Sequence, residues 1–156
     1  MCEGIFTPRL SMPDHLTESA GLQKRTVTLS PAAEPLVQFL YREQPPYLPV
    51  WWEGQLLILP WGSNNKTSRL PRMGWCWQEH LESGRWGWLQ PEPVEIPACC
   101  GFDGGVWYQV QEGMRGVVVR DEQRQPRVYM LTQSATHYYE IMTRRNRAPV
   151  LINQTI

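Results

Sequence analysis

The chain has 156 residues, of which 42% are hydrophobic and 19% charged, and its formal net charge is zero. This size and composition are typical of one soluble globular domain, and no apolar run approaches the ~20 residues that a membrane-spanning helix needs. The first residues also lack the charged start and apolar middle of a signal peptide, so we expect a cytoplasmic protein without a membrane segment. Eight Trp and fourteen Pro predict a fold rich in strands and loops.

The chain opens on Met1-Cys2. Removal of Met1 would leave Cys2 with a free α-amine beside its thiol, and such an aminothiol attacks carbonyl compounds. The alternative is that Cys2 is merely tolerated at a frayed end. We expect instead that the segment 2–6 enters a sheet and places the thiol at the floor of a concave site.

The first half of the chain predicts loops, a helix and a hairpin. Residues 7–24 are polar and punctuated by Pro and Gly, which indicates a loop with one helical turn. Ser30 followed by Pro31 predicts a helix over residues 31–43. The segment 47–61, centred on Glu53-Gly54, predicts a hairpin in which the strands of Val50 and Ile58 pair. Residues 63–74 are expected to be a loop, and residues 75–84 a short helix that ends at Gly84.

The second half predicts mainly strands. Four runs of β-branched or aromatic residues, at 92–98, 105–111, 116–121 and 127–132, are bounded by turn residues. Ser134 is expected to cap a short helix over 135–142, and residues 148–153 a closing strand. The whole chain, residues 1–156, is therefore expected to be a single α+β domain. Its strand-dominated mixed sheet should curl toward a barrel, with a few short helices and with Trp61, Trp107 and Tyr129 largely buried.

The cysteines do not predict a metal site. Cys2, Cys76, Cys99 and Cys100 form no C-x-x-C pair, and all four are expected to be thiols. Cys76 and His80 lie four residues apart, but no spacing supplies the further two ligands of a zinc site. The segment 101–105, GFDGG, lacks the Lys and the following helix of a phosphate-binding loop, and no hydrolase triad can be recognised from spacing. We expect no metal and no cofactor.

Basic residues are concentrated toward the C-terminus. Residues 115–156 contain seven Arg and three acids, whereas residues 1–114 contain eight bases and twelve acids. One interpretation is a solvated face of an Arg-rich protein. The other is a basic stripe that binds a nucleic-acid backbone, because the planar guanidinium group suits phosphate.

Several motifs occur in an order that resembles one protein family. They are MCEGIF at the N-terminus, LPVWWEGQLLILPWG at 48–62, IPACCGFDGGVWYQVQEG at 96–113, and RNRAPVLI at 145–152. Their order and spacing resemble the SOS-response-associated peptidase (SRAP) family. The resemblance implies a compact α+β domain with a barrel-like sheet. It also implies a DNA-damage function, in which the Cys amine and thiol condense with the aldehyde of an abasic site in single-stranded DNA.

The chain departs from the family pattern at its assisting residues. Tyr108 stands where the family has Glu, and Arg145 stands where it has His. The family's Asn motif corresponds to Asn64 or Asn65, without its Ala-Arg neighbours. The resemblance therefore implies Cys2, Tyr108 and Arg145 as catalytic residues. The nucleic-acid contacts are expected to be Asn64, Asn65, Arg115, Arg144 and Arg147, with the Arg residues and Arg145 on one exposed face.

The resemblance leaves three functions open. The first is a divergent SRAP-like protein that binds single-stranded or abasic DNA and crosslinks to it through Cys2. The second is a non-catalytic remnant of phage or plasmid type that serves as a structural or protein-interaction module, which the replacements at Tyr108 and Arg145 favour. The third is a thiol peptidase that cleaves its own leader.

Overall fold

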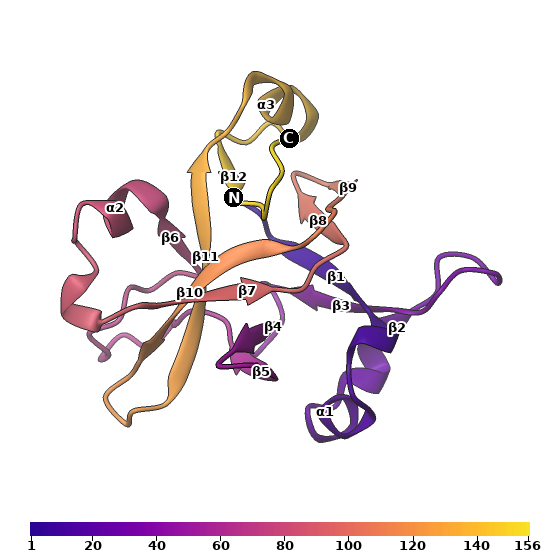
Figure 1. Cartoon of the computed structure of the whole chain (residues 1–156), viewed down its shortest axis with the longest axis horizontal. Helices are drawn as coiled ribbons and strands as arrows, with labels where there is room; N and C mark the ends of the chain where they lie inside the picture. The colour runs from indigo at the N-terminus through magenta and orange to yellow at the C-terminus, as the bar shows by residue number, and fades with distance from the viewer.

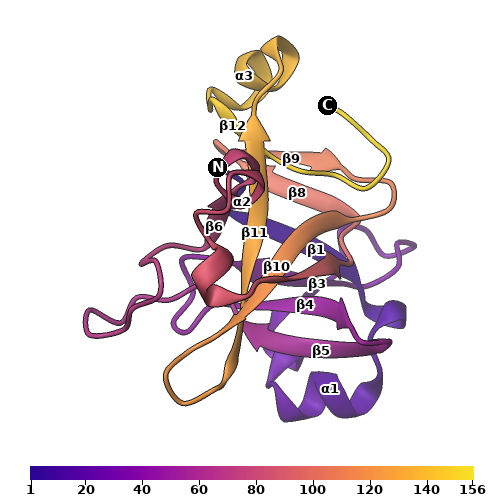
Figure 2. The same cartoon turned by 60° about the vertical axis from the view of Figure 1, so that its left-hand side comes forward.

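The strands of the chain form two separate sheets, as a computed structural model of residues 1–156 shows (Figures 1 and 2). Together with a few short helices they make a single strand-dominated α+β domain, as the sequence predicts. The expectation of one sheet curled toward a barrel is not met. Each sheet ends in strands that pair on one side only, so neither sheet closes.

The five-stranded sheet is antiparallel throughout. Its strands, in spatial order, are β2 (Thr26–Val27), β3 (Leu36–Leu40), β1 (Gly4–Pro8), β8 (Cys100–Asp103) and β9 (Val106–Gln109). β1 lies in the middle, with Gly4 opposite Leu40 on one side and opposite Phe102 on the other. The N-terminal segment is therefore held in the interior of a sheet and not at an edge.

The seven-stranded sheet is mixed, because β6 pairs with β11 in parallel. Its strands are β12 (Arg147–Pro149), β11 (Pro126–Ser134), β10 (Met114–Arg120), β7 (Glu92–Ile96), β4 (Tyr47–Trp52), β5 (Gln55–Pro60) and the off-path β6 (Trp75–Trp77). The predicted hairpin is confirmed: β4 and β5 pair with Val50 opposite Leu57. Its turn residues Glu53 and Gly54 have φ of 52° and 77°, as the tight turns of two-residue hairpins require.

The helices are short and peripheral. They are α1 (Asp14–Ser19), α2 (Gln78–Glu82) and α3 (His137–Thr143), with 3-10 turns at Arg9–Ser11, Leu22–Arg25 and Gly87–Leu89. α3 is capped by Thr136, whose hydroxyl accepts a hydrogen bond from the Tyr139 amide at 3.1 Å, and not by the expected Ser134. Both termini lie toward the end of the molecule that carries α3, and the β10–β11 loop lies at the opposite end (Figures 1 and 2). None of these helices has the length and apolar character needed to cross a membrane.

The predicted helix over residues 31–43 is wrong. Residues 31–33 form a turn, and Leu36–Leu40 form strand β3. Val37 and Phe39 are fully buried while Leu36 and Gln38 are not, which is the two-residue alternation of a strand. Pairing with β1 and β2 satisfies the backbone on both sides of β3, and this non-local gain overrides the local helix-start signal.

The core has two parts that share strand β10. Val118 belongs to the larger buried cluster, which includes Trp61, whereas Val117 and Val119 belong to the smaller one, which includes Tyr129. Burial of Trp61 and Tyr129 is therefore confirmed. The prediction is wrong for Trp107, which is 38% exposed and stacks on the Phe6 ring, with ring centroids 4.0 Å apart.

Candidate functional site

Cys2 is held in place by its backbone. The Glu3 amide donates to the Phe102 carbonyl at 2.7 Å, and the Trp75 indole N–H donates to the Cys2 carbonyl at 2.8 Å. Cys2 is thus positioned by hydrogen bonds of its backbone and of its neighbour, although strand β1 begins at Gly4 and not at Cys2 as predicted. Its side chain, however, has no exposed surface, so the thiol is covered and does not lie on the floor of an open groove.

Tyr108 reaches Cys2 because its ring lies across a glycine. Gly101 on β8 and Tyr108 on β9 are paired residues, and a Cβ at position 101 would lie 2.5 Å from Cζ of the Tyr108 ring. The absent side chain lets the phenol lie across β8 beside the Cys2 thiol, whose pKa it lowers. The thiol itself donates to the Gly4 carbonyl at 3.2 Å.

A chain of hydrogen bonds continues from Tyr108 to a buried carboxylate. The Tyr108 and Tyr139 hydroxyls are 3.0 Å apart, and the Tyr139 hydroxyl donates to Oδ2 of Asp103 at 2.9 Å. Tyr139 comes from α3 and Asp103 from the end of β8. Gly104 allows this approach, because a Cβ there would lie 1.9 Å from the Thr143 carbonyl oxygen at the end of α3.

Two cations face the Asp103 carboxylate, which has no exposed surface. The Met1 amine lies 3.5 Å from Oδ2, and Nε of Arg145 lies 3.5 Å from Oδ1. The second contact is one of charge alone, since Oδ1 has no hydrogen-bond partner. Arg145 also approaches Glu3 at 3.4 Å. We refer to Cys2, Asp103, Tyr108, Tyr139 and Arg145 together as the Cys2 cluster.

Burial controls the protonation of this cluster. It raises the pKa of the Cys2 thiol to about 11, although hydrogen bonds from Tyr108 and from backbone groups oppose the shift. Burial also raises the pKa of Asp103, against the opposing effect of the Met1 amine and of the Tyr139 hydroxyl. The Tyr108 and Tyr139 pKa values are raised for the same reason. At neutral pH the Cys2 thiol is therefore protonated.

A cavity of about 330 Å³ lies close to Cys2, although no member of the Cys2 cluster lines it. Glu3, the neighbour of Cys2, lines it together with Trp75, whose indole holds the Cys2 carbonyl. Phe102 and Tyr41 supply further aromatic surface, and Arg42 supplies a positive charge. Aromatic faces with a cation are the surfaces on which unpaired bases stack.

The structure separates the four arginines expected on one face. Arg144 is exposed and directly precedes Arg145. Arg115 lies on β10 opposite Glu95 and lines a different cavity with Trp51. The expectation of exposure is wrong for Arg147, which is 7% exposed. Its guanidinium group binds Glu79 at 2.9 Å and lies over the Trp77 ring.

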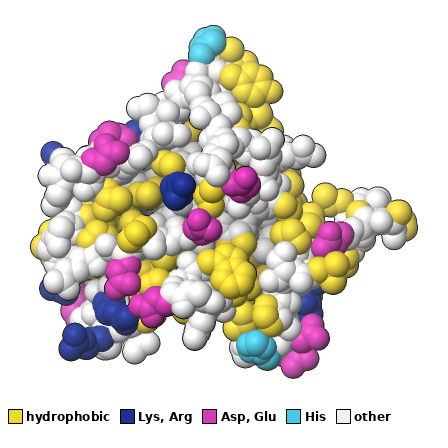
Figure 3. Space-filling model, viewed as in Figure 1, with side chains coloured by type: hydrophobic (Ala, Val, Ile, Leu, Met, Phe, Trp, Pro, Cys, Tyr) yellow, Lys and Arg dark blue, Asp and Glu magenta, His cyan; other side chains and the backbone are white.

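No basic stripe is visible on the face drawn in Figure 3, where acidic and basic side chains are interspersed. Asn64 and Asn65 lie in the loop between β5 and β6. The Asn65 side chain accepts hydrogen bonds from the amide and hydroxyl of Thr67, so it stabilises its own loop. Asn64 lines a cavity that contains no member of the Cys2 cluster.

Sequence reasoning identified three members of the cluster and missed two. Cys2, Tyr108 and Arg145 come from motif positions, and the structure brings them together through Asp103 and Tyr139. Asp103 precedes Gly104-Gly105, a context that normally indicates an exposed turn. The signal that could have found it is the alternation along β8, where Gly101 and Asp103 are buried on one face.

The chain was compared with protein-family models, with curated proteins and with solved structures, and none of the three comparisons found a match. What the structure shows is that Tyr108 and Arg145 belong to one connected set of side chains next to Cys2.

Proposed function

We propose that this protein is a divergent SRAP-like protein that binds single-stranded DNA and crosslinks to abasic sites through Cys2 once Met1 is removed. The single observation that carries the proposal is the series of contacts that runs from Tyr108 through Tyr139 and Asp103 to Arg145. This series lies beside Cys2, a residue that one cleavage turns into an aminothiol.

The reaction needs no cofactor and balances as a condensation. The α-amine of Cys2 adds to the aldehyde carbon of the opened deoxyribose and loses water, which forms an imine. The thiol sulfur then adds to the imine carbon, and the thiol proton is transferred to nitrogen. The product is a five-membered thiazolidine ring that joins the DNA to the N-terminus.

The cluster supplies proton transfer and charge for these steps. Tyr108 lies beside the thiol, and Tyr139 connects it to Asp103, a buried carboxyl group whose pKa is raised by burial and to which we assign the proton transfer. Removal of Met1 moves the N-terminal amine, one of the two cations near Asp103, from Met1 to Cys2. The neighbouring cavity, lined by Trp75, Phe102 and Arg42, would hold the adjoining nucleotide.

We expect a preparation without Met1, verified by intact mass, to form a covalent adduct with an abasic single-stranded oligonucleotide on a denaturing gel. Cys2→Ala should form none. Asp103→Asn should slow the adduct by ~10²-fold, the lower end of the effect of general acid–base groups. Cys100→Ala is the control, because it removes a different thiol, one that is only partly buried, and it should react like the wild type.

One observation favours the alternative, a non-catalytic remnant used as a structural or protein-interaction module. The thiol is fully buried and its pKa is raised to about 11, so few molecules carry a thiolate at neutral pH. The same experiment separates the two functions. Equal crosslinking by wild type and Cys2→Ala, or none by either after complete Met1 removal, supports the remnant and contradicts the crosslinking proposal.

A further inference from the structure

A large cavity lies at the opposite end from the Cys2 cluster, where β10 turns into β11. It measures about 550 Å³, a size that accommodates small ligands. Its residues come from the loop before β6, from the 3-10 turn Gly87–Leu89 and from the β10–β11 loop. Neither the motif order nor the proposed chemistry at Cys2 assigns it a role.

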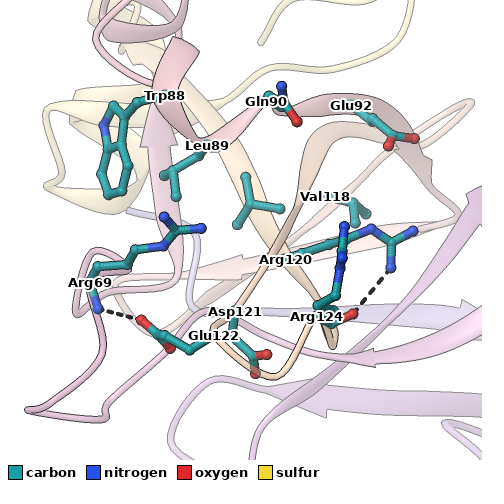
Figure 4. Close-up of a pocket in the computed structure, with 11 residues that line it drawn as sticks. Arg69, Trp88, Leu89, Gln90, Glu92, Val118, Arg120, Asp121, Glu122 and Arg124 are labelled. Carbon is teal, nitrogen blue, oxygen red and sulfur yellow. Dashed lines mark hydrogen bonds between the residues drawn. The ribbon is translucent and has the colours of Figure 1, made fainter.

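The cavity has an aromatic wall and a cationic wall. Figure 4 shows Arg69, Trp88 and Leu89 on one side, and Arg120 and Arg124 on the other. The Trp88 indole is 55% exposed, and the Arg69 guanidinium lies 5.5 Å from its ring centroid. An exposed indole of this kind offers a flat face on which a planar ligand can stack.

The acids around this cavity are already satisfied by the chain itself. Glu122 accepts hydrogen bonds from the Ser68 hydroxyl and from the Arg69 amide at 2.7 Å. Glu92 accepts one from the Trp52 indole at 2.8 Å. The Asp121 carboxylate accepts the amides of Gln123 and Gln125 and pairs with Arg127, which lies outside the cavity. These three carboxylates line the cavity, but each already accepts hydrogen bonds from groups of the chain.

The cations of the same cavity are free. None of Arg69, Arg120 and Arg124 forms an ion pair. Arg120 donates to the Arg124 carbonyl at 3.2 Å and lies over the Trp52 ring, which fixes its position. Arg124 lies in the same loop with a φ of 63°, and its side chain is exposed and forms no ion pair. Guanidinium groups without a carboxylate partner are suited to an anion, above all to phosphate.

We propose that this cavity binds a nucleotide, with the base against Trp88 and the phosphate between the guanidinium groups of Arg120 and Arg124. The two walls together require a ligand that is flat and aromatic at one end and anionic at the other. The side chain of Gln90, whose amide has no partner within the chain, lies on the rim and supplies hydrogen bonds to the edge of the base. The nucleotide can be free or can be one unit of a single strand.

The test is calorimetric titration of the intact protein with a nucleoside monophosphate, the matching nucleoside, inorganic phosphate and a short oligothymidylate. We expect the monophosphate to bind more tightly than either of its parts. Trp88→Ala should weaken it about tenfold, in the range of base stacking on an aromatic side chain. Arg124→Asn should weaken the monophosphate about tenfold and leave the nucleoside unchanged, since Asn tolerates the positive φ at this position.

Matched controls separate this site from the rest of the surface. Trp51→Ala and Arg72→Asn change an exposed Trp and an exposed Arg outside the cavity and should leave binding unchanged. Cys2→Ala should also leave it unchanged, so failure of the crosslinking proposal and failure of this one are distinguishable.

The two sources of the nucleotide give different results. Tighter binding of the oligonucleotide, lost in Trp88→Ala and Arg124→Asn, identifies a strand, whereas equal or tighter binding of the monophosphate identifies the free nucleotide. Absence of binding by both, or binding that neither variant weakens, overturns the proposal.

Discussion

Tyr139 is the residue on which the Cys2 cluster depends, because its hydroxyl joins Tyr108 to Asp103. Tyr139→Phe keeps the ring and removes the hydroxyl, which leaves Oδ2 of a buried carboxylate with only the Met1 amine. An unsatisfied buried polar group costs ~1–3 kcal/mol, and we expect the free energy of unfolding in urea to fall by this amount. The neighbouring Tyr138 is 65% exposed, so Tyr138→Phe is the control and should change stability by less than ~0.5 kcal/mol. Equal stability of both variants would contradict the role given to the Tyr139 hydroxyl.

Among single residues, the sequence predicts those that occupy motif positions. It does not predict those, such as Tyr139, whose side chains connect the motif residues in space. Cys2, Tyr108 and Arg145 follow from motif order, whereas Tyr139 reaches the site only because α3 packs against the β8–β9 turn. Arg147 shows the converse. The sequence places it among exposed phosphate contacts, yet the ion pair with Glu79, 68 residues earlier, takes it into the interior. Nothing near either residue in the sequence indicates such a contact.

The β8–β9 turn is the element that sets the position of α3. Gly104→Ala would place a Cβ 1.9 Å from the Thr143 carbonyl oxygen, at a φ of 56°. Because backbone meets backbone, we expect a loss of ~3 kcal/mol or more in the free energy of unfolding, together with loss of the Cys2 cluster. Gly105→Ala is the matched control. Its φ is 80° but no atom lies within 4 Å of the new Cβ, so only the strain of ~1–2 kcal/mol should appear.

Urea denaturation of both variants checks this prediction, and equal losses of stability would mean that the contact with α3 does not contribute to stability.

The strands differ in how far the local sequence determines them. The β4–β5 hairpin is determined locally by Glu53-Gly54 and was predictable. Strand β3 was not, since a run such as Leu36–Leu40 suits a helix or a strand, and its partners β1 and β2 decide between them.

The whole molecule should unfold as one unit because both buried clusters share β10. Val117 contributes to the smaller cluster and Val118 to the larger one. Each Val→Ala change should cost ~2 kcal/mol, from lost burial and the cavity left behind. We expect tryptophan fluorescence and far-ultraviolet circular dichroism to give coincident urea transitions in the wild type and in both variants. A transition that splits in either variant would show that the two clusters fold independently.

The distribution of exposed positive charge over the molecule depends on which Arg residues form ion pairs and not on how many Arg residues a segment contains. The C-terminal region has a clear excess of Arg in the sequence, which suggests a basic face. In the structure Arg127 pairs with Asp121, Arg145 with Asp103 and Arg147 with Glu79. The excess Arg residues are therefore partly neutralised by ion pairs and do not form one basic face. Counting charges along the sequence does not predict this distribution.

The crossing of the Tyr108 ring over Gly101 also constrains how this protein can evolve. A side chain at position 101 and an aromatic ring at position 108 would occupy the same space, so we expect substitutions at the two positions to be coupled. A lineage can shorten residue 108 first and then fill position 101, but the reverse order passes through an intermediate that cannot pack. An aromatic ring at position 108 can lie beside Cys2 only where residue 101 is Gly. Homologues with another residue at position 101 are therefore expected to lack an aromatic ring at position 108.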